Sequence, residues 1–186
     1  GSVCVELVRS RKDARSIARK AFSRQGRGTH NPYLRQKNYV FFQEFIHNDG
    51  YDIRVIVTGN NLFGYYRKTP QGDFRASGMH MTEKRDLPPG AMHLALRMNS
   101  VVRSPVLVVD MVRSLKDEFF IIEFSPTCQM AKPEQLKVNG EPGRYVHDAR
   151  NARFEFQKGR WWVHELALKE FLETDYLSFL SKSDTK

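Results

Sequence analysis

The sequence predicts an α+β protein with a largely antiparallel sheet and packed helices, with an α/β order as the alternative. Three observations support this class. Short apolar segments flank turn-forming residues, as at 52–59 and 62–68, which lie on either side of an Asn-Asn pair. Two longer segments, 11–22 and 91–102, place apolar residues at helical spacing. Hydrophobic residues make up 40% of the 186, enough for one sizeable core.

In the first half of the chain, a strand and a helix are expected before three further strands. Residues 3–10 are rich in β-forming residues, and residues 11–22 follow as a helix. Gly, Asn and Pro mark residues 23–37 as a loop. Strands are expected at 39–46, 52–59 and 62–68, of which the last two form a hairpin.

The second half begins with a polar segment, residues 69–90, whose Gly and Pro content predicts a long loop. A helix is expected next, at 91–102, because its apolar residues lie on one face. The remaining expected elements are strands at 106–112 and 118–124 joined as a hairpin, a small hairpin within 153–163, and a helix at 164–180 with Leu168, Phe171, Leu172 and Phe179 facing inward.

The net charge of +9 is concentrated at the N-terminus. Residues 1–39 contain ten Lys and Arg against two acids, Glu6 and Asp13, which leaves +8 in this segment. Such a segment can bind nucleic acid or another phosphate-rich partner through counterion release. The alternative is a solvated helix face with a basic loop. The rest of the chain is close to neutral.

Two cysteines, Cys4 and Cys128, lie far apart and have no metal-ligand or CxxC spacing. A reduced, cytoplasmic setting is therefore expected instead of a disulfide. The sequence has no run of 18 apolar residues and no apolar N-terminal stretch. Neither a membrane span nor a secretory signal is expected.

Two carboxylates stand alone in the apolar strands at 106–112 and 118–124. A hairpin closed near Leu115-Lys116 places Asp110 opposite Glu123. Opposed like charges destabilise a sheet unless something neutralises them, and oxygen ligands favour Mg²⁺ or Mn²⁺. The alternative is a register that differs by one or two residues and leaves one carboxylate on the solvent face.

Five motifs occur in order: "FFQEFI", "YDIRVIVTGNNLFGYYRK", "GDFRASG", "VVDMVRS" and "FIIEFSP". In this order and at these separations, they resemble the central and C-terminal parts of ATP-grasp carboxylate-amine ligases. The match is to the RimK-like group, which adds glutamate to a ribosomal protein's tail, and it runs from about residue 5 to 126. The resemblance implies two α+β lobes that hold ATP between them. It also implies a reaction in which a carboxylate and ATP form an acylphosphate that an amine, or a thiol, then attacks.

The resemblance implies roles for single residues in "QEFI" and at the start of the next strand. Glu44, Phe45 and Ile46 match the segment whose main chain pairs with adenine. Asp52 matches the acidic position that binds ribose hydroxyls, although an aspartate that caps the hairpin is the alternative from the sequence alone. ATP and Mg²⁺ are the cofactors implied.

Three cations match positions near the triphosphate or the acyl group: Arg54, Lys68 and Arg75, with Arg75 as the catalytic residue. Such cations would offset charge that develops on the transferred phosphoryl group. The metal ligands implied are Asp110, Glu123 and Ser125.

The sequence departs from the family pattern in two places. Ser125 stands where the family usually has the Asn that completes the metal shell, and Ala76-Ser77 stand where Ser-Asn is usual. The Lys-bearing strand and Gly-rich loop of the family would lie upstream of residue 3, so the chain is expected to be a fragment that binds nucleotide weakly and does not ligate alone.

We expect a partial ATP-grasp domain at residues 3–126 and a C-terminal extension with a hairpin and a terminal helix at 127–186. The carboxylate and amine substrates stay open among peptides, amino acids and carrier proteins. The alternative function is a catalytically impaired module that binds nucleic acid or an acidic partner through its basic N-terminal segment.

Overall fold

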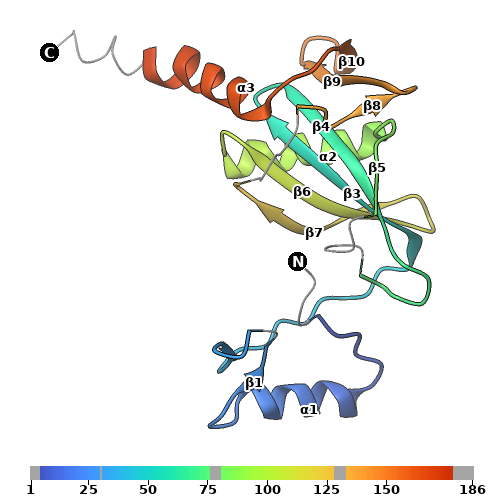
Figure 1. Ribbon diagram of the computed structural model, residues 1–186, viewed down its shortest axis with the longest axis vertical. Coiled ribbons are helices and arrows are strands. Elements are labelled where there is room, and N and C mark those ends of the chain that lie inside the picture. The colour runs from blue at the N-terminus through green and yellow to red at the C-terminus, as the bar shows by residue number, and fades with distance from the viewer. Residues whose placement is uncertain (1–4, 30, 76–80, 128–132, 178–186) are drawn as a thin grey trace, which may run out of the picture.

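The computed structural model describes residues 5–29, 31–75, 81–127 and 133–177. Its centre is an antiparallel sheet with strand order β10-β9-β4-β3-β6-β7 (Figure 1). This confirms the predicted α+β class and its largely antiparallel sheet. The strands of this path are β3 (Asn48–Thr58), β4 (Asn61–Lys68), β6 (Leu107–Ser114), β7 (Phe119–Ser125), β9 (Glu141–Asp148) and β10 (Arg153–Lys158).

Two tight hairpins form the β4-β3-β6-β7 part of the sheet, and both were predicted. The turn between β3 and β4 contains Gly59 in the left-handed region, at φ +51°, where glycine is favoured. The second hairpin joins β6 to β7 and has Asp117 at φ +69°. The two-residue strands β5 (Thr82–Glu83) and β8 (Lys137–Val138) pair with β4 and β9. Part of the loop predicted at 69–90 is therefore a short strand.

One face of the sheet packs against helix α2 (Pro89–Val102). Side chains alternate along strands, so odd-numbered residues of β3 and β6 share this face. The helix contributes its own small apolar residues, and Phe119 of β7 lies against Gly90. The buried core on this side contains Ile53, Val55, Val57, Leu62, Tyr66, Leu87, Ala91, Met92, Ala95, Leu107, Val109, Met111 and Leu136.

The opposite face of the sheet is divided into an apolar end and a charged end. The apolar end holds Ile56, Phe63, Val106 and Val108. Val163 covers it, at the start of helix α3 (Val163–Glu170). The charged end carries the other even-numbered residues of β3 and β6 and faces the N-terminal part of the chain.

The N-terminal part contains helix α1 (Arg11–Ala21) and the small hairpin of β1 (Arg27–Gly28) with β2 (Arg35–Gln36). Ser10 caps α1, because its hydroxyl accepts a hydrogen bond from the Asp13 amide at 3.1 Å. The predicted helix at 11–22 is thus confirmed. Figure 1 shows α1 at the end of the molecule opposite α3.

Two predicted strands are wrong. Residues 5–9 of the predicted strand 3–10 form no strand, and neither does any part of 39–46. In the described part of the chain, no strand pairs with either segment. Three aromatic residues of the second segment, Phe41, Phe42 and Phe45, are exposed. An apolar run without a neighbouring strand to satisfy its main chain stays irregular.

The C-terminal part also differs from the prediction. The hairpin expected within 153–163 is instead formed by β9 and β10, whose turn the Asp148 carboxylate stabilises by accepting from the Arg150 amide at 3.0 Å. Strand β9 pairs with β4, so this hairpin extends the main sheet.

Helix α3 continues as the π-helical segment Phe171–Tyr176 and projects from the sheet (Figure 1). Leu168, Phe171 and Leu172 were predicted to face inward but are exposed, because the helix contacts the sheet mainly through its first turns. Phe179, which was predicted to face inward as well, lies outside the described residues. Among the described residues, no helix has the length and apolar character needed to cross a membrane.

Candidate functional site

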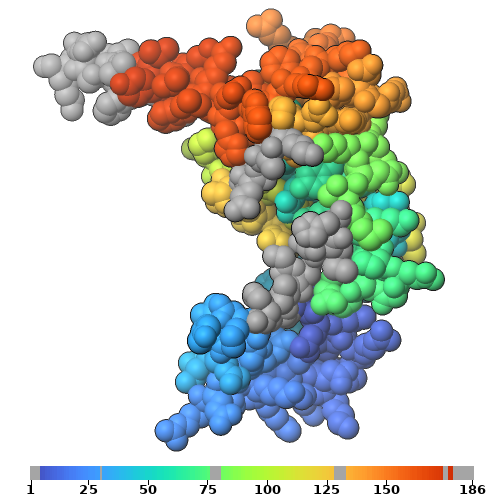
Figure 2. All heavy atoms as spheres, viewed as in Figure 1, coloured from blue at the N-terminus to red at the C-terminus, as the bar shows by residue number. Residues whose placement is uncertain are grey.

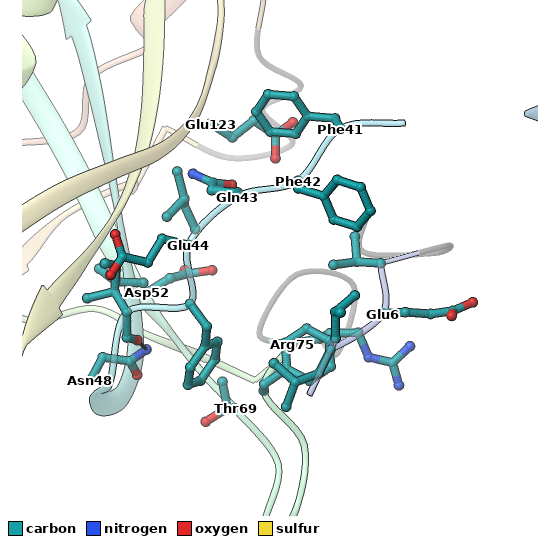
Figure 3. Close-up of a pocket in the computed structure, with 18 of the residues that line it drawn as sticks. Glu6, Phe41, Phe42, Gln43, Glu44, Asn48, Asp52, Thr69, Arg75 and Glu123 are labelled. Carbon is teal, nitrogen blue, oxygen red and sulfur yellow. Dashed lines mark hydrogen bonds between the residues drawn. The ribbon is translucent and has the colours of Figure 1, made fainter. Parts of the chain in front are cut away.

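A cavity of about 530 Å³ lies between the charged end of the sheet and the N-terminal part of the chain. This volume is within the range of small-molecule sites. Its walls come from segments far apart in the sequence: residues 5–8, 40–46, the ends of β3 and β4, and β7. Figure 3 shows Phe41, Phe42, Glu44, Asp52 and Glu123 around this hollow, with Arg75 across from Glu44. Figure 2 shows the molecule hollowed between its N-terminal end and α3.

The segment 44–46 forms part of the cavity wall. Glu44, Phe45 and Ile46 all line it, as the resemblance implied. The Ile46 carbonyl accepts from the Asn48 side-chain amide at 2.9 Å. Among the described residues, the amides of 44–46 and the carbonyls of Glu44 and Phe45 have no protein partner. Unpaired amides and carbonyls along one segment can bind a flat ligand that has both donors and acceptors.

Four charged side chains beside the cavity form what is called the charged cluster below: the buried Asp52, Arg67 and Asp110, and the half-buried Arg54. Arg54 donates two hydrogen bonds to Asp110, from Nε to Oδ1 and from Nη2 to Oδ2, each 2.8 Å long. Arg67 bridges the two acids, with Nε 2.6 Å from Asp52 Oδ1 and Nη2 2.7 Å from Asp110 Oδ2. Two positive and two negative charges offset each other, which makes their burial tolerable.

The same contacts shift the pKa values of both acids. Burial raises the pKa of the Asp52 carboxyl above its ordinary value, and the hydrogen bond from Arg67 offsets this only in part. Burial acts on Asp110 in the same direction, but the hydrogen bonds and charges of Arg54 and Arg67 outweigh it and hold the pKa of Asp110 below its ordinary value. Asp110 is therefore the more firmly charged acid. The bond to Asp110 in turn raises the pKa of Arg54.

The register of the central hairpin decides which cation of "YRK" belongs to the site. Arg67 lies directly opposite Asp52, and Lys68 lies opposite Tyr51. Because side chains alternate, Lys68 is on the other face of β4 from Arg67, where it is exposed. The structure thus places Arg67 in the charged cluster and leaves Lys68 outside it. Arg67 was not predicted as a site residue, although pairing the two strands on either side of Gly59 would have placed it opposite Asp52.

The predicted pairing of Asp110 with Glu123 is confirmed by the register of β6 and β7. A bulge follows at once, since Met111 lies opposite Ile121 and Ile122 is the extra residue. Glu123 is exposed at the cavity wall, and no hydrogen bond or ion pair joins its carboxylate to another described residue. The charge on Asp110, in contrast, is already balanced by Arg54 and Arg67.

The two carboxylates fit a Mg²⁺ site in their chemistry. A carboxylate has about four acceptor positions, and the arginines use three of those on Asp110, which leaves one on Oδ1. Glu123 supplies a second, unpaired carboxylate. Within the described ranges, no group of three or more His, Cys, Asp or Glu side chains could hold a metal by itself. Any Mg²⁺ here would need further ligands from substrate or water.

Ser125 makes contacts that a metal ligand would have to give up. Its hydroxyl lies 2.9 Å from the Thr127 carbonyl, to which it donates, and it accepts from the Thr127 amide at 3.3 Å. These bonds form a local turn at the end of β7. Ser125 lies opposite Val108 of the apolar end and is not among the residues that line the cavity. Ala76 and Ser77, the other departure from the family pattern, lie outside the described residues.

Arg75 lines the cavity and is held by its neighbour in sequence, Asp73. Its Nη2 lies 2.8 Å from Asp73 Oδ2, and its amide also donates to Asp73 at 3.0 Å. These hydrogen bonds lower the pKa of Asp73 and keep the pair charged. Phe74 between them contacts Phe45 edge to face, with ring centres 6.3 Å apart. The loop that carries Arg75 thus packs against Phe45 through Phe74, while the guanidinium itself is paired with Asp73.

The fold and the site together define an α+β domain with a helix on one sheet face and a cavity beside charged side chains on the other. The family model for the RimK-like ATP-grasp domain matches residues 5–141. This chain belongs to that family. Among curated proteins, no sequence matches it significantly.

Solved structures similar to the chain include three enzymes, each with a TM-score of 0.37. Macrocyclase MdnB from Microcystis aeruginosa MRC is 15% identical over 48% of this chain and 32% of its own. Macrocyclase MdnC from the same organism, bound with precursor peptide MdnA, is 14% identical over 45% and 25%. A Chryseobacterium gregarium RiPP-associated ATP-grasp ligase, in complex with ADP and a leader and core peptide, is 20% identical over 45% and 27%. The chain thus spans a third or less of the length of these proteins.

Proposed function

We propose that the cavity binds ATP with Mg²⁺ and that the chain is part of an ATP-dependent ligase that joins a carboxylate to an amine or thiol. One observation carries the proposal: the cavity wall brings together Glu44, Phe45, Ile46, Asp52, Arg75 and Glu123, which the sequence motifs had singled out independently. Membership of the RimK-like ATP-grasp family, whose model matches residues 5–141, supports the same function.

In this proposal, adenine lies along the main chain of residues 44–46, where the three amides and the carbonyls of Glu44 and Phe45 bond to no described residue and can match its donors and acceptors. Phe45 and Phe74 supply the apolar surface for the ring. Asp52 stands at the wall, where its second carboxylate oxygen can accept from a ribose hydroxyl while Oδ1 stays on Arg67.

The phosphates then extend toward the charged residues. Arg67 uses two of its five N–H donors within the cluster, and Arg75 is already charged at the opposite wall. Asp110 and Glu123 would hold Mg²⁺, which supplies charge that offsets the phosphate oxygens when it is bound. Positioned cations are the main contribution of a protein to phosphoryl transfer.

The reaction that follows has two steps. A substrate carboxylate oxygen attacks the terminal phosphorus of ATP, the bond to ADP breaks, and an acylphosphate forms. The amine or thiol then attacks the acyl carbon, and inorganic phosphate leaves with its bonding pair. Arg54, Arg67 and Arg75 would offset the negative charge on the transferred phosphoryl group, with Arg75 nearest the reacting end.

Glu123→Gln tests the proposal with little risk to folding, because the Glu123 carboxylate is exposed and bonds to no other described residue. Calorimetric titration with ATP, with and without Mg²⁺, should show that Mg²⁺ strengthens ATP binding to the wild type. Loss of a charge-assisted contact of about 1.5–3 kcal/mol should cost the variant roughly tenfold or more in affinity with Mg²⁺ present.

Glu118→Gln is the matched control, because Glu118 is an exposed carboxylate just before the same strand. It should bind as the wild type does. Equal affinities and equal Mg²⁺ effects in the wild type and Glu123→Gln would remove Glu123 from the site. Absence of ATP binding to the wild type would overturn the proposed function.

A further inference from the structure

Helix α1 carries a row of cations that the cavity does not use. Arg11, Arg15 and Arg19 follow one another at intervals of four residues, about 6 Å apart along the helix axis. Lys12 and Lys20 flank the row. All five side chains are exposed, because the helix turns Ala14, Ile17, Ala18 and Ala21 toward the rest of the molecule.

These cations have no acidic partner among the described residues. None of them takes part in any of the ion pairs that join described residues, and the only acid on α1 is Asp13, which lies in its first turn. Most described arginines of the sheet, in contrast, are paired with an acid, as Arg54 is with Asp110. An unpaired row of like charges on a short helix costs stability, so it indicates a polyanionic partner.

Exposed aromatic rings lie where the basic row ends. The Asn38 amide donates to the Ala21 carbonyl at 3.0 Å, which sets the chain after β2 against the end of α1. The residues that follow these two, Tyr39 and Phe22, are each 62% exposed. A third ring, on Tyr33, is 92% exposed at the tip of the β1-β2 hairpin. Arg35 and Lys37, both exposed, lie between Tyr33 and Tyr39 in the sequence.

We propose that α1 and the β2 segment form a binding surface for single-stranded nucleic acid, with phosphates on the arginine row and bases stacked on Phe22, Tyr39 and Tyr33. Basic side chains that follow a backbone, next to exposed rings that accept any base, are the two parts of such surfaces. A duplex keeps its bases stacked inside and cannot use the rings. An acidic peptide would use the charges but has no flat rings to stack.

The test is fluorescence anisotropy with labelled oligothymidylate and oligouridylate of about 12 nucleotides, since single-strand sites cover roughly 4–16. Salt is varied from about 50 to 200 mM, the range over which phosphate contacts lose affinity steeply. Each contact to a single strand contributes about 0.7 to the logarithmic salt slope, so Arg15→Gln/Arg19→Gln should reduce the slope by about 1.4 and the affinity by about 25-fold near 0.1 M salt.

Loss of the aromatic rings should affect affinity and salt dependence differently. Phe22→Ala/Tyr39→Ala should weaken binding by about fivefold or more and leave the salt slope unchanged, because stacking involves no counterion. Arg97→Gln/Lys116→Gln removes two exposed cations elsewhere and is the matched control, which should bind as the wild type does. Saturating ATP should leave oligonucleotide binding unchanged, which separates this surface from the cavity.

Four results would overturn the proposal. The first is that the oligonucleotides do not bind at low salt, and the second is that the control variant loses as much affinity as the arginine variant. The third is that a duplex of the same length binds with equal affinity. The fourth is that polyglutamate of equal charge competes fully while the aromatic variant binds as the wild type does. The last result would assign the row to an acidic peptide instead.

Discussion

Arg67→Met tests whether the charged cluster is the electrostatic centre of the site. Arg67 joins Asp52 at 2.6 Å and Asp110 at 2.7 Å, and its side chain is only 9% exposed. Methionine keeps the length of the side chain and removes the charge, which leaves two buried acids with Arg54 alone. Removing one partner of a buried ion pair costs about 3–5 kcal/mol. At about 2–4 °C per kcal/mol for a chain of this size, Tm should fall by roughly 6–20 °C.

The stability that Arg67→Met loses should decrease as the pH falls. Burial already raises the pKa of Asp52, and loss of Arg67 raises it further. A carboxyl whose folded-state pKa is raised takes up its proton more readily in the folded protein, so falling pH relieves the cost. The deficit of Arg67→Met in the free energy of unfolding should therefore shrink as the pH falls through the raised pKa of Asp52 toward the ordinary value of a carboxyl group. Urea unfolding at several pH values measures it.

Two variants complete this test. Arg113→Met breaks the exposed pair with Asp117 and should cost at most about 1 kcal/mol. Asp52→Asn/Arg67→Met removes one charge of each sign, and it should be more stable than Arg67→Met alone, because the remaining Asp110 and Arg54 are balanced. If Arg67→Met is no less stable than Arg113→Met, the reasoning about the cluster is wrong.

Three further outcomes follow from particular contacts. Gly64→Ala would place a Cβ 2.2 Å from the Arg54 carbonyl oxygen and should destabilise the protein by about 1–3 kcal/mol, measured by urea unfolding. On acidification from about pH 5 to pH 2, Asp110→Asn should lose less stability than the wild type does. The folded-state pKa of Asp110 is lowered, so its contribution to wild-type stability disappears as the pH falls through that pKa. Acid titration followed by circular dichroism measures both losses, and equal losses would contradict the prediction. Ile53→Ala empties a fully buried position under α2 and should cost about 2–5 kcal/mol in thermal or urea unfolding, while a loss below 1 kcal/mol would mean that α2 does not pack there tightly.

The central hairpins could be predicted because their sequences contain both signals that a hairpin needs. Residues 52–59 and 62–68 are apolar segments, the first with alternating apolar and polar residues, on either side of a turn. The turn sets the register of the two strands. The same rule placed Asp110 opposite Glu123, and the structure agrees. Applied to the first hairpin, it would also have paired Arg67 with Asp52. Arg67 could therefore have been predicted from the sequence.

Other parts could not be predicted, because the local pattern carries no information on the neighbour. "YVFFQEFI" has the composition of a strand, yet it lines a cavity, since no described strand lies beside it. Strand β9 begins at Glu141 and continues with Pro142 and Gly143, residues that argue against a strand. Gly143 is required there, because a Cβ would lie 2.3 Å from the Phe156 ring. The charge balance around Asp110 likewise depends on three strands that meet only in the fold.

The most direct test of the ATP site is photolabelling of the protein with 8-azido-ATP and Mg²⁺, followed by peptide mapping. Trypsin cleaves after Lys37 and Arg54, so residues 44–46 fall in the single peptide 38–54. We expect the label in this peptide, and excess ATP should prevent it while excess polyglutamate should not. Label confined to peptides outside the cavity wall, or label in 38–54 that ATP does not reduce, would contradict the placement of adenine along residues 44–46.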